Sequence, residues 1–241
     1  MYAAFVIGNI ASGKSTATRY LESRGAHRID LDQWAKDLYV PGSDVVQEIA
    51  ETFGYDVLDA EGGIQRRLLA ERAFSTPESI ASLNAIVHPR LKQRLSEILL
   101  PSLCCSVSLP DYGLLVIEVS VPRAFQDIFP LADAVLAITA PLEVRRERAI
   151  ERGMDSDDFD ARSACQPSED ELRSMATVVI DNTSADNSLF AQLDRWLETL
   201  PEADCGHVAS MRNMDTDRLT HAVSAAPEPS QDTSLKGDVH G

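Results

Sequence analysis

The segment at residues 8–15 reads GNIASGKS and fits the phosphate-loop pattern of a glycine, four residues, and then Gly-Lys-Ser. It follows the apolar stretch FVI and precedes the helix-like segment KSTATRYLES, which is the strand-loop-helix setting that this pattern requires. Glycines let the backbone curl so that successive N–H groups face phosphate oxygens, and the following helix adds its positive amino-terminal dipole. The loop therefore predicts an α/β domain that binds the phosphates of a nucleotide.

Within this loop, we expect Lys14 to contact the outer phosphates and the hydroxyl of Ser15 to bind Mg²⁺. The guanine-reading motifs Thr-Lys-x-Asp and Asn-Lys-x-Asp are missing, so a GTPase switch is not expected. The residues predicted to line the nucleotide site are Gly8, Asn9, Ile10, Ala11, Ser12, Gly13, Lys14, Ser15 and Thr16.

Short strand-like stretches alternate with helical patterns over the first 200 residues. Two of the stretches, LLVIEV and AVLAIT, are almost entirely apolar, as is typical of strands buried on both faces. We expect strands at residues 3–7, 26–30, 114–119, 134–139 and 178–181, and helices at about 14–24, 43–53, 66–74, 77–99, 141–152, 168–175 and 187–199. This alternation predicts a three-layer α/β fold, with a five-stranded parallel sheet flanked by helices.

Composition limits the possible partners. The formal net charge of -16 argues against binding to nucleic acid or anionic lipid, so any anionic substrate must be held by a local basic site. The first ten residues lack the features of a signal peptide, and no apolar run approaches the roughly 20 residues that span a bilayer. We therefore expect a cytoplasmic protein that binds neither membrane nor nucleic acid, and nothing in the sequence demands more than a monomer.

The end of the chain differs in composition from the rest. Residues 203–241 contain no Phe, Trp, Tyr or Ile and are rich in Ala, Ser, Asp and Pro. Such a segment does not bury enough apolar surface to offset its ordering entropy. We predict a P-loop domain over residues 1–200 and a disordered tail over 203–241.

Two acidic residues follow the second expected strand. In an extended chain, Asp30 and Asp32 would share a face at the carboxyl edge of the sheet, where open α/β sheets bind ligands. One of these carboxylates would accept the proton of an acceptor hydroxyl or hold that hydroxyl through Mg²⁺. The alternative is that Asp32 caps the helix-like segment QWAKDLY, and the pattern alone favours the cap.

Two further features have two interpretations each. Glu118 ends the expected strand at 114–119, where it would either join the Mg²⁺ shell or simply end a buried strand. The helix after Pro141 carries Arg145, Arg148 and Arg152 on one face, with glutamates at neighbouring positions. This pattern favours a solvated helix with ion pairs, and the alternative is a lid whose arginines close over the phosphates.

Taken together, these residues resemble the dephospho-coenzyme A kinase family of bacteria. The loop GNIASGKST is similar to that family's GGIGSGKST, and IDLD with the later Pro-Gly is similar to its Asp-x-Asp and Pro-Gly. The other similar stretches keep their order over residues 3–182: Phe53-Gly54, Ile64-Gln65-Arg66, Ile86-Val87-His88-Pro89, Arg148 with Arg152, Arg162 with Gln166, and the stretch from Ala176 to Asn182.

The resemblance implies a nucleotide-binding core, a helical coenzyme A-binding region over about 33–110 and a lid over about 141–175. It also implies transfer of the ATP γ-phosphate to the ribose 3′-hydroxyl of dephospho-CoA. Asp32 would be the catalytic carboxylate, and Lys14 and Arg148 would stabilise the transferring charge. Arg66 and His88, together with Asp32, would bind the acceptor.

The chain departs from the family pattern at several positions. Asn9 and Ala11 replace two loop glycines, Arg145 stands where the family has Gln, and the stretch SVPRA replaces Pro-Leu-Leu-Phe-Glu after Glu118. Two alternatives follow from these departures. One is another P-loop kinase acting on a small molecule or nucleotide, and the other is a nucleotide-binding regulatory protein with reduced catalysis.

Overall fold

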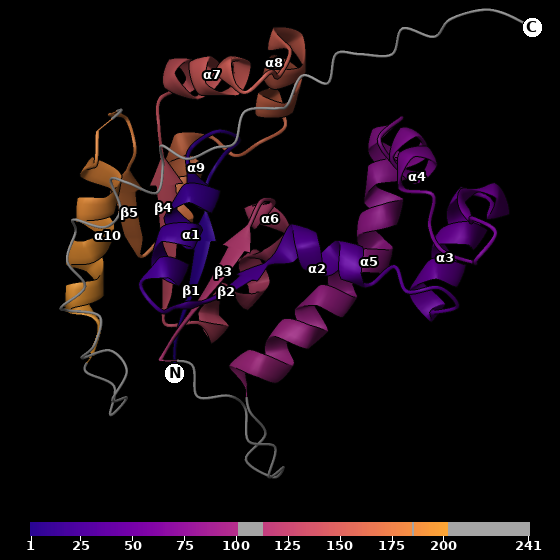
Figure 1. The fold of residues 1–241 in the computed structure, drawn as a ribbon, viewed down its shortest axis with the longest axis horizontal. Coiled ribbons are helices and arrows are strands. Elements are labelled where there is room, and N and C mark those ends of the chain that lie inside the picture. The colour runs from indigo at the N-terminus through magenta and orange to yellow at the C-terminus, as the bar shows by residue number, and fades with distance from the viewer. Residues whose placement is uncertain (101–112, 185, 202–241) are drawn as a thin grey trace, which may run out of the picture.

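The computed structural model describes residues 1–100, 113–184 and 186–201 (Figure 1). Its centre is a five-stranded, fully parallel sheet with the strand order β2-β3-β1-β4-β5. The five predicted strands are confirmed to within one residue at each end: β1 (Tyr2–Ile7), β2 (His27–Asp30), β3 (Leu114–Val119), β4 (Ala134–Thr139) and β5 (Val178–Asp181). The predicted tail lies outside the described residues and stays a prediction.

The helices of the described ranges include all seven that were predicted. They are α1 (Lys14–Ser23), α2 (Leu31–Asp37), α3 (Asp44–Phe53), α4 (Arg66–Ala73), α5 (Pro77–Leu99), α6 (Pro122–Phe125), α7 (Leu142–Glu151), α8 (Ser156–Ala164), α9 (Glu169–Met175) and α10 (Ser188–Thr199), with 3₁₀ turns η1 (Tyr55–Val57) and η2 (Gln126–Leu131). Helices α6 and α8 were not predicted. The first is a single turn, and the second, SDDFDARSA, buries only Phe159 and so carries no apolar periodicity.

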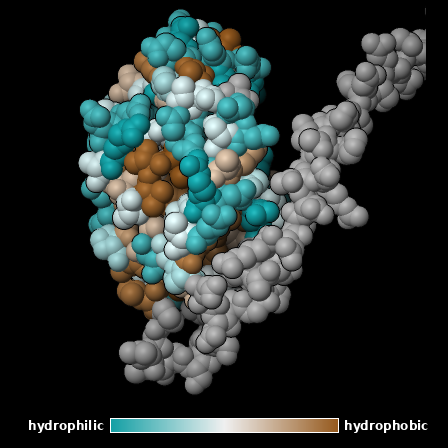
Figure 2. Space-filling view, turned by 90° about the vertical axis from the view of Figure 1, so that its left-hand side faces the viewer, coloured by the Kyte–Doolittle hydropathy of each residue, from teal (hydrophilic) through white to brown (hydrophobic). Residues whose placement is uncertain are grey.

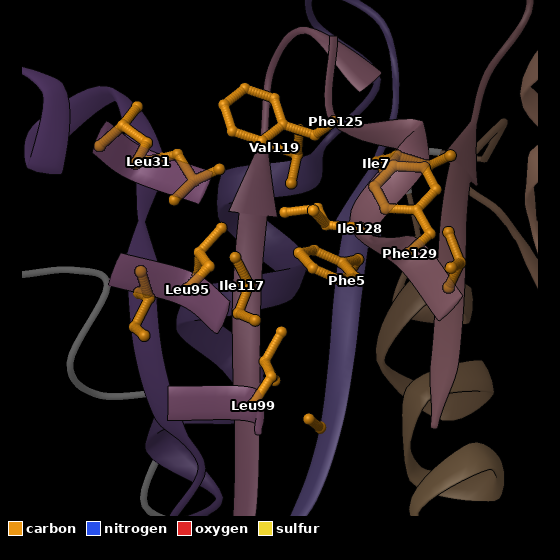
Figure 3. Packing of buried hydrophobic residues seen from close by; sticks show 14 of the residues in the cluster. Phe5, Ile7, Leu31, Leu95, Leu99, Ile117, Val119, Phe125, Ile128 and Phe129 are labelled. Atoms are coloured by element: carbon orange, nitrogen blue, oxygen red, sulfur yellow. The ribbon is translucent and has the colours of Figure 1, made fainter. Parts of the chain in front are cut away.

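Alternate residues of the strands pack on opposite faces of the sheet. Phe5 and Ile7 of β1 belong to one core cluster, which includes Leu95 of α5, Phe125 of α6 and Phe129 of η2 (Figure 3). On the other face, residues such as Val6 and Leu136 pack against α1 and α10. Figure 2 shows the side of the molecule that carries β5 and α10, where hydrophilic residues surround a smaller hydrophobic group. The predicted three-layer arrangement is therefore confirmed.

A second helical unit lies beside the sheet. Helices α3 and α4 pack on the amino-terminal part of α5 and share a separate core that includes Ile49, Leu69 and Ile86. In Figure 1 this unit stands apart from the sheet, beyond α2. Helices α7 and α8, which belong to the stretch predicted to be a lid, lie at the top of the same view. Helix α9 leads back to the sheet, where Leu172 joins the main core. No helix in the described ranges is both long and apolar enough to cross a membrane.

Candidate active site

The phosphate loop connects β1, the central strand, with the start of α1. Gly8 has φ 155° and Gly13 has φ 104°, which are backbone conformations that residues other than glycine rarely adopt. A Cβ atom on Gly8 would lie 2.5 Å from the carbonyl oxygen of Ile138, and one on Gly13 would overlap the amide of Asn182. Both glycines are therefore required by backbone conformation and by close neighbours, as the motif predicts.

Hydrogen bonds with two distant segments hold the loop in place. Asn182, after β5, donates from Nδ2 to the carbonyl of Ser12 at 2.8 Å, and Asn9 donates from Nδ2 to the carbonyl of Pro167 at 2.8 Å. The Oε1 atom of Gln166 accepts the Ile10 N–H at 2.9 Å. Asn9, which replaces a family glycine, thus contacts the connection between α8 and α9.

Lys14 lies in the field of three carboxylates. Burial lowers the pKa of its ammonium group, while the negative charges of Glu118, Asp32 and Asp30 act to raise it. The three carboxylates come from the carboxyl ends of two neighbouring strands and from the start of α2. The expectation that Asp30 and Asp32 lie at this edge, near the loop, is therefore confirmed.

Glu118 is buried, at 5% exposure, and both of its carboxylate oxygens are hydrogen bonded. Its Oε1 accepts the Ser15 hydroxyl at 2.5 Å, and its Oε2 accepts the Thr18 hydroxyl at 2.8 Å and Nη2 of Arg28 at 2.6 Å. Burial acts to raise the pKa of Glu118, but the hydrogen bonds from Ser15, Arg28 and Thr18 together hold it below its usual value. Of the two interpretations of Glu118, these contacts favour the place beside Ser15, whose hydroxyl is the predicted magnesium ligand.

Asp30, rather than Asp32, is the cap of helix α2. Its Oδ1 accepts the backbone N–H groups of Asp32 at 3.0 Å and Gln33 at 3.2 Å. The prediction of an Asp32 cap is wrong, and so is the premise that both aspartates belong to one extended stretch. The helix begins at Leu31, so Asp32 lies in its first turn, where its side chain is exposed and its Oδ2 accepts the Ser120 hydroxyl at 2.8 Å.

The arginines of α7 differ in their contacts. Arg145 is buried and donates from Nε to the carbonyl of Ala140 at 3.1 Å. Arg148 donates to the carbonyl of Asn182 at 2.8 Å and to that of Ser184 at 3.3 Å. Arg152 lines a cavity of 310 Å³ together with Ile10, Ala11, Ala149, Gly153 and Met154. The expected solvated helix with ion pairs is wrong for Arg145 and Arg148, because both bind backbone carbonyls.

The two predicted acceptor residues lie in the helical unit and its long helix. His88 of α5 packs on the Phe125 ring with 5.0 Å between ring centres, and burial and the charge of Lys92 lower its pKa. Arg66 opens α4, is exposed, and exerts its charge on Tyr39. Within the described ranges, no hydrogen bond or ion pair joins either residue to the phosphate loop.

Sequence reasoning gave no site role to four residues that contact the predicted site: Thr18, Arg28, Ser120 and Asn182. Arg28 carried a usable signal, because it precedes Asp30 by two residues and therefore shares its face of β2. Thr18 lies one helical turn after Ser15, which places both hydroxyls on one side of α1. Ser120 carried no such signal, because its partner Asp32 is 88 residues away in the sequence.

A phosphate loop at the carboxyl edge of a parallel sheet, with an arginine-bearing helix, α7, after β4, defines this chain as a P-loop protein of the kinase type. The family model for dephospho-CoA kinase matches residues 4–187, and the chain belongs to that family.

Individual relatives agree with this assignment. The chain is 36% identical to the dephospho-CoA kinase of Corynebacterium diphtheriae over 180 residues, which cover 74% of this chain and 86% of the relative. It is 35% identical to that of Anaeromyxobacter dehalogenans, over 80% and 89% of the two chains. The crystal structure of TT1252 from Thermus thermophilus matches with a TM-score of 0.65 and 30% identity, over 83% of this chain and 98% of that one. Dephospho-CoA kinase from Campylobacter jejuni, at 22% identity and a TM-score of 0.55, shares the fold.

Proposed function

We propose that this chain transfers the γ-phosphate of ATP to the ribose 3′-hydroxyl of dephospho-CoA, which is the last step of coenzyme A synthesis. The observation that carries the proposal is the meeting of Lys14, Ser15 and the carboxylates of Glu118 and Asp32 at one edge of the sheet, in a chain of this family. These are the groups that a phosphoryl transfer needs, namely a cation for the phosphates, a magnesium ligand and a base.

In this proposal, the loop residues 8–16 hold the triphosphate. Backbone N–H groups and Lys14 bind phosphate oxygens, and Arg152 contributes charge from the adjoining cavity. Mg²⁺ prefers oxygen ligands and is usually bound by one or two protein groups together with substrate phosphates. The Ser15 hydroxyl and the Glu118 carboxylate beside it fit such an ion, which, when bound, would neutralise charge on the outer phosphates.

The acceptor hydroxyl is oriented by Asp32, which takes its proton as the phosphoryl group transfers. Ser120 binds one oxygen of this carboxylate, and the other oxygen is left for the acceptor. We place Arg66 and His88 on the acceptor side, as binding residues of the helical unit. Because burial and Lys92 lower the pKa of His88, its imidazole is neutral near pH 7 and acts as a hydrogen-bonding group rather than a charge.

We propose Arg148 as the second cation, after Lys14, that stabilises the negative charge of the transferring phosphoryl group. In this conformation its guanidinium is bound to the carbonyls of Asn182 and Ser184, so the role requires the lid to move. We further propose that the protein acts as a cytoplasmic monomer. Two other functions compete with this proposal: phosphorylation of a different small molecule, and nucleotide binding without transfer.

A coupled ADP-release assay with Mg-ATP tests the proposal. Dephospho-CoA is compared with a panel of nucleoside monophosphates and with no acceptor, using the full chain and its Lys14→Ala variant. We expect turnover with dephospho-CoA alone and its loss in the variant. Turnover with another acceptor would keep the kinase and overturn the substrate, and ATP binding without turnover on any acceptor would favour the regulatory alternative.

A further inference from the structure

Arg28 lies on β2, and its guanidinium group contacts three side chains of the site. Its Nε donates to the Thr18 hydroxyl at 2.9 Å, and its Nη2 donates to Asp30 Oδ2 at 2.7 Å and to Glu118 Oε2 at 2.6 Å. The side chains of Arg28 and Glu118 are 16% and 6% exposed, so water screens this ion pair only weakly.

Arg28 binds one oxygen each of Glu118 and Asp30. The second oxygen of each carboxylate accepts a hydrogen bond from a residue that is proposed to act in the reaction. Glu118 Oε1 accepts the Ser15 hydroxyl at 2.5 Å, and Asp30 Oδ1 accepts the backbone N–H of Asp32 at 3.0 Å. One continuous chain of hydrogen bonds therefore runs from the Ser15 hydroxyl, the proposed magnesium ligand, to the backbone N–H of Asp32, whose side chain is the proposed base. Arg28 is the link at its centre.

Arg28 also determines which cation pairs with the carboxylates. Within the described ranges, Lys14 has no ion pair shorter than 4.0 Å, although the negative charges of Glu118, Asp32 and Asp30 all act on it. Arg28 forms ion pairs with Asp30 and Glu118. Because these carboxylates already have a cation, Lys14 is left for phosphate oxygens rather than being drawn into an internal ion pair.

We propose that Arg28 is a positioning residue for phosphoryl transfer. It fixes Glu118 against Ser15, whose hydroxyl is the proposed magnesium ligand. It also fixes the start of the helix that carries Asp32, and it keeps Lys14 available for the nucleotide. This inference rests on the roles proposed above for Ser15, Asp32 and Lys14. A purely structural ion pair would instead affect stability alone.

The test compares Arg28→Met and Arg28→Lys with the double variant Arg28→Met/Glu118→Gln, in the full chain. Arg24→Met is the matched control, since Arg24 also forms a partly buried ion pair, with Asp194 at 3.3 Å, but lies at the far end of α1. Two quantities are measured: kcat and KM with dephospho-CoA, and the rise in Tm on adding ATP with Mg²⁺ minus the rise with ATP and EDTA. The second quantity reports Mg²⁺ binding without requiring turnover.

We expect Arg28→Met to lower kcat by about tenfold to a hundredfold, the range typical of groups that orient metal ligands, with KM for dephospho-CoA unchanged. The Mg²⁺ part of the Tm rise, which is the rise with ATP and Mg²⁺ minus the rise with ATP and EDTA, should become smaller as well. Arg28→Lys keeps the positive charge but loses the several N–H donors of the planar guanidinium group. Its kcat should therefore lie between those of the wild type and Arg28→Met. The double variant removes both charges, so its Tm should recover toward the wild-type value while kcat stays low.

Arg24→Met should lower Tm without changing kcat. A wild-type kcat and a wild-type Mg²⁺ effect in Arg28→Met would overturn the inference, whatever happens to its Tm. If that variant does not fold, the double variant decides, because a wild-type kcat there would equally refute a positioning role. If the wild-type chain shows no turnover, the proposed function fails, and the Mg²⁺ part of the Tm rise still tests Arg28.

Discussion

In the described part of the chain, the Asp32 side chain forms one hydrogen bond, which it accepts from the Ser120 hydroxyl. The effect of removing this hydroxyl on the reaction rate follows from the strength of that bond. Both side chains are accessible to water, so the hydrogen bond at 2.8 Å contributes about 1 kcal/mol net. If that energy orients Asp32 in the transition state, Ser120→Ala should lower kcat by about fivefold. KM for ATP should not change, because Ser120 has no contact with the phosphate loop.

Steady-state rates of ADP release with dephospho-CoA measure this effect. Ser120→Thr keeps the hydroxyl and should retain most of the activity, while Ser82→Ala, which removes a hydroxyl bonded only within α5, is the control. In an Asp32→Asn background, Ser120→Ala should cost nothing further, since the two residues act as a unit. An unchanged kcat in Ser120→Ala would refute the reasoning, and a loss far beyond about tenfold would show that Ser120 contacts the substrate itself.

Two further substitutions test the phosphate loop and the neighbouring carboxylate of Glu118. Gly13→Ala should weaken ATP binding by about tenfold or more in calorimetry, because its Cβ would overlap Asn182. Gly42→Ala, also at a positive φ of 77° but with open space around its Cβ, should leave ATP affinity unchanged. Glu118→Gln should lower Tm by about 5–10 °C at neutral pH. Folding depresses the pKa of Glu118 below its usual value of 4.5. The Tm difference between the wild type and Glu118→Gln should therefore narrow only below pH 4.5. A Tm difference that stays constant with pH would contradict a charged, hydrogen-bonded Glu118.

The sequence allowed the sheet and the loop to be predicted because their signals are local. Strands such as LLVIEV are apolar throughout, and the loop motif brings its own conformational requirements. The start of α2 was misplaced because Asp30 and Asp32 are both good caps, and only the backbone at Leu31 decides between them. Helix α8 was missed because its single buried residue gives no periodicity.

The partners of the site residues were harder to predict, because they depend on tertiary contacts. The charge pattern of α7 is that of a solvated helix, yet Arg145 and Arg148 bind carbonyls of the loops after β4 and β5. Their partners are backbone groups, which leave no trace in a pattern of side-chain charges. The link between Ser120 and Asp32 likewise depends on the pairing of β2 with β3, which brings Asp30 beside Glu118.

Asn182 connects helix α7 to the phosphate loop through two different groups. Its side chain donates to the carbonyl of Ser12, and its own carbonyl accepts from Arg148 of α7. Its backbone N–H is bonded to Thr139 at 2.8 Å, so it is anchored to the end of β4 as well. Replacing the Asn182 side chain should therefore weaken ATP binding in calorimetry, because it removes the hydrogen bond that holds the carbonyl of Ser12 in the phosphate loop.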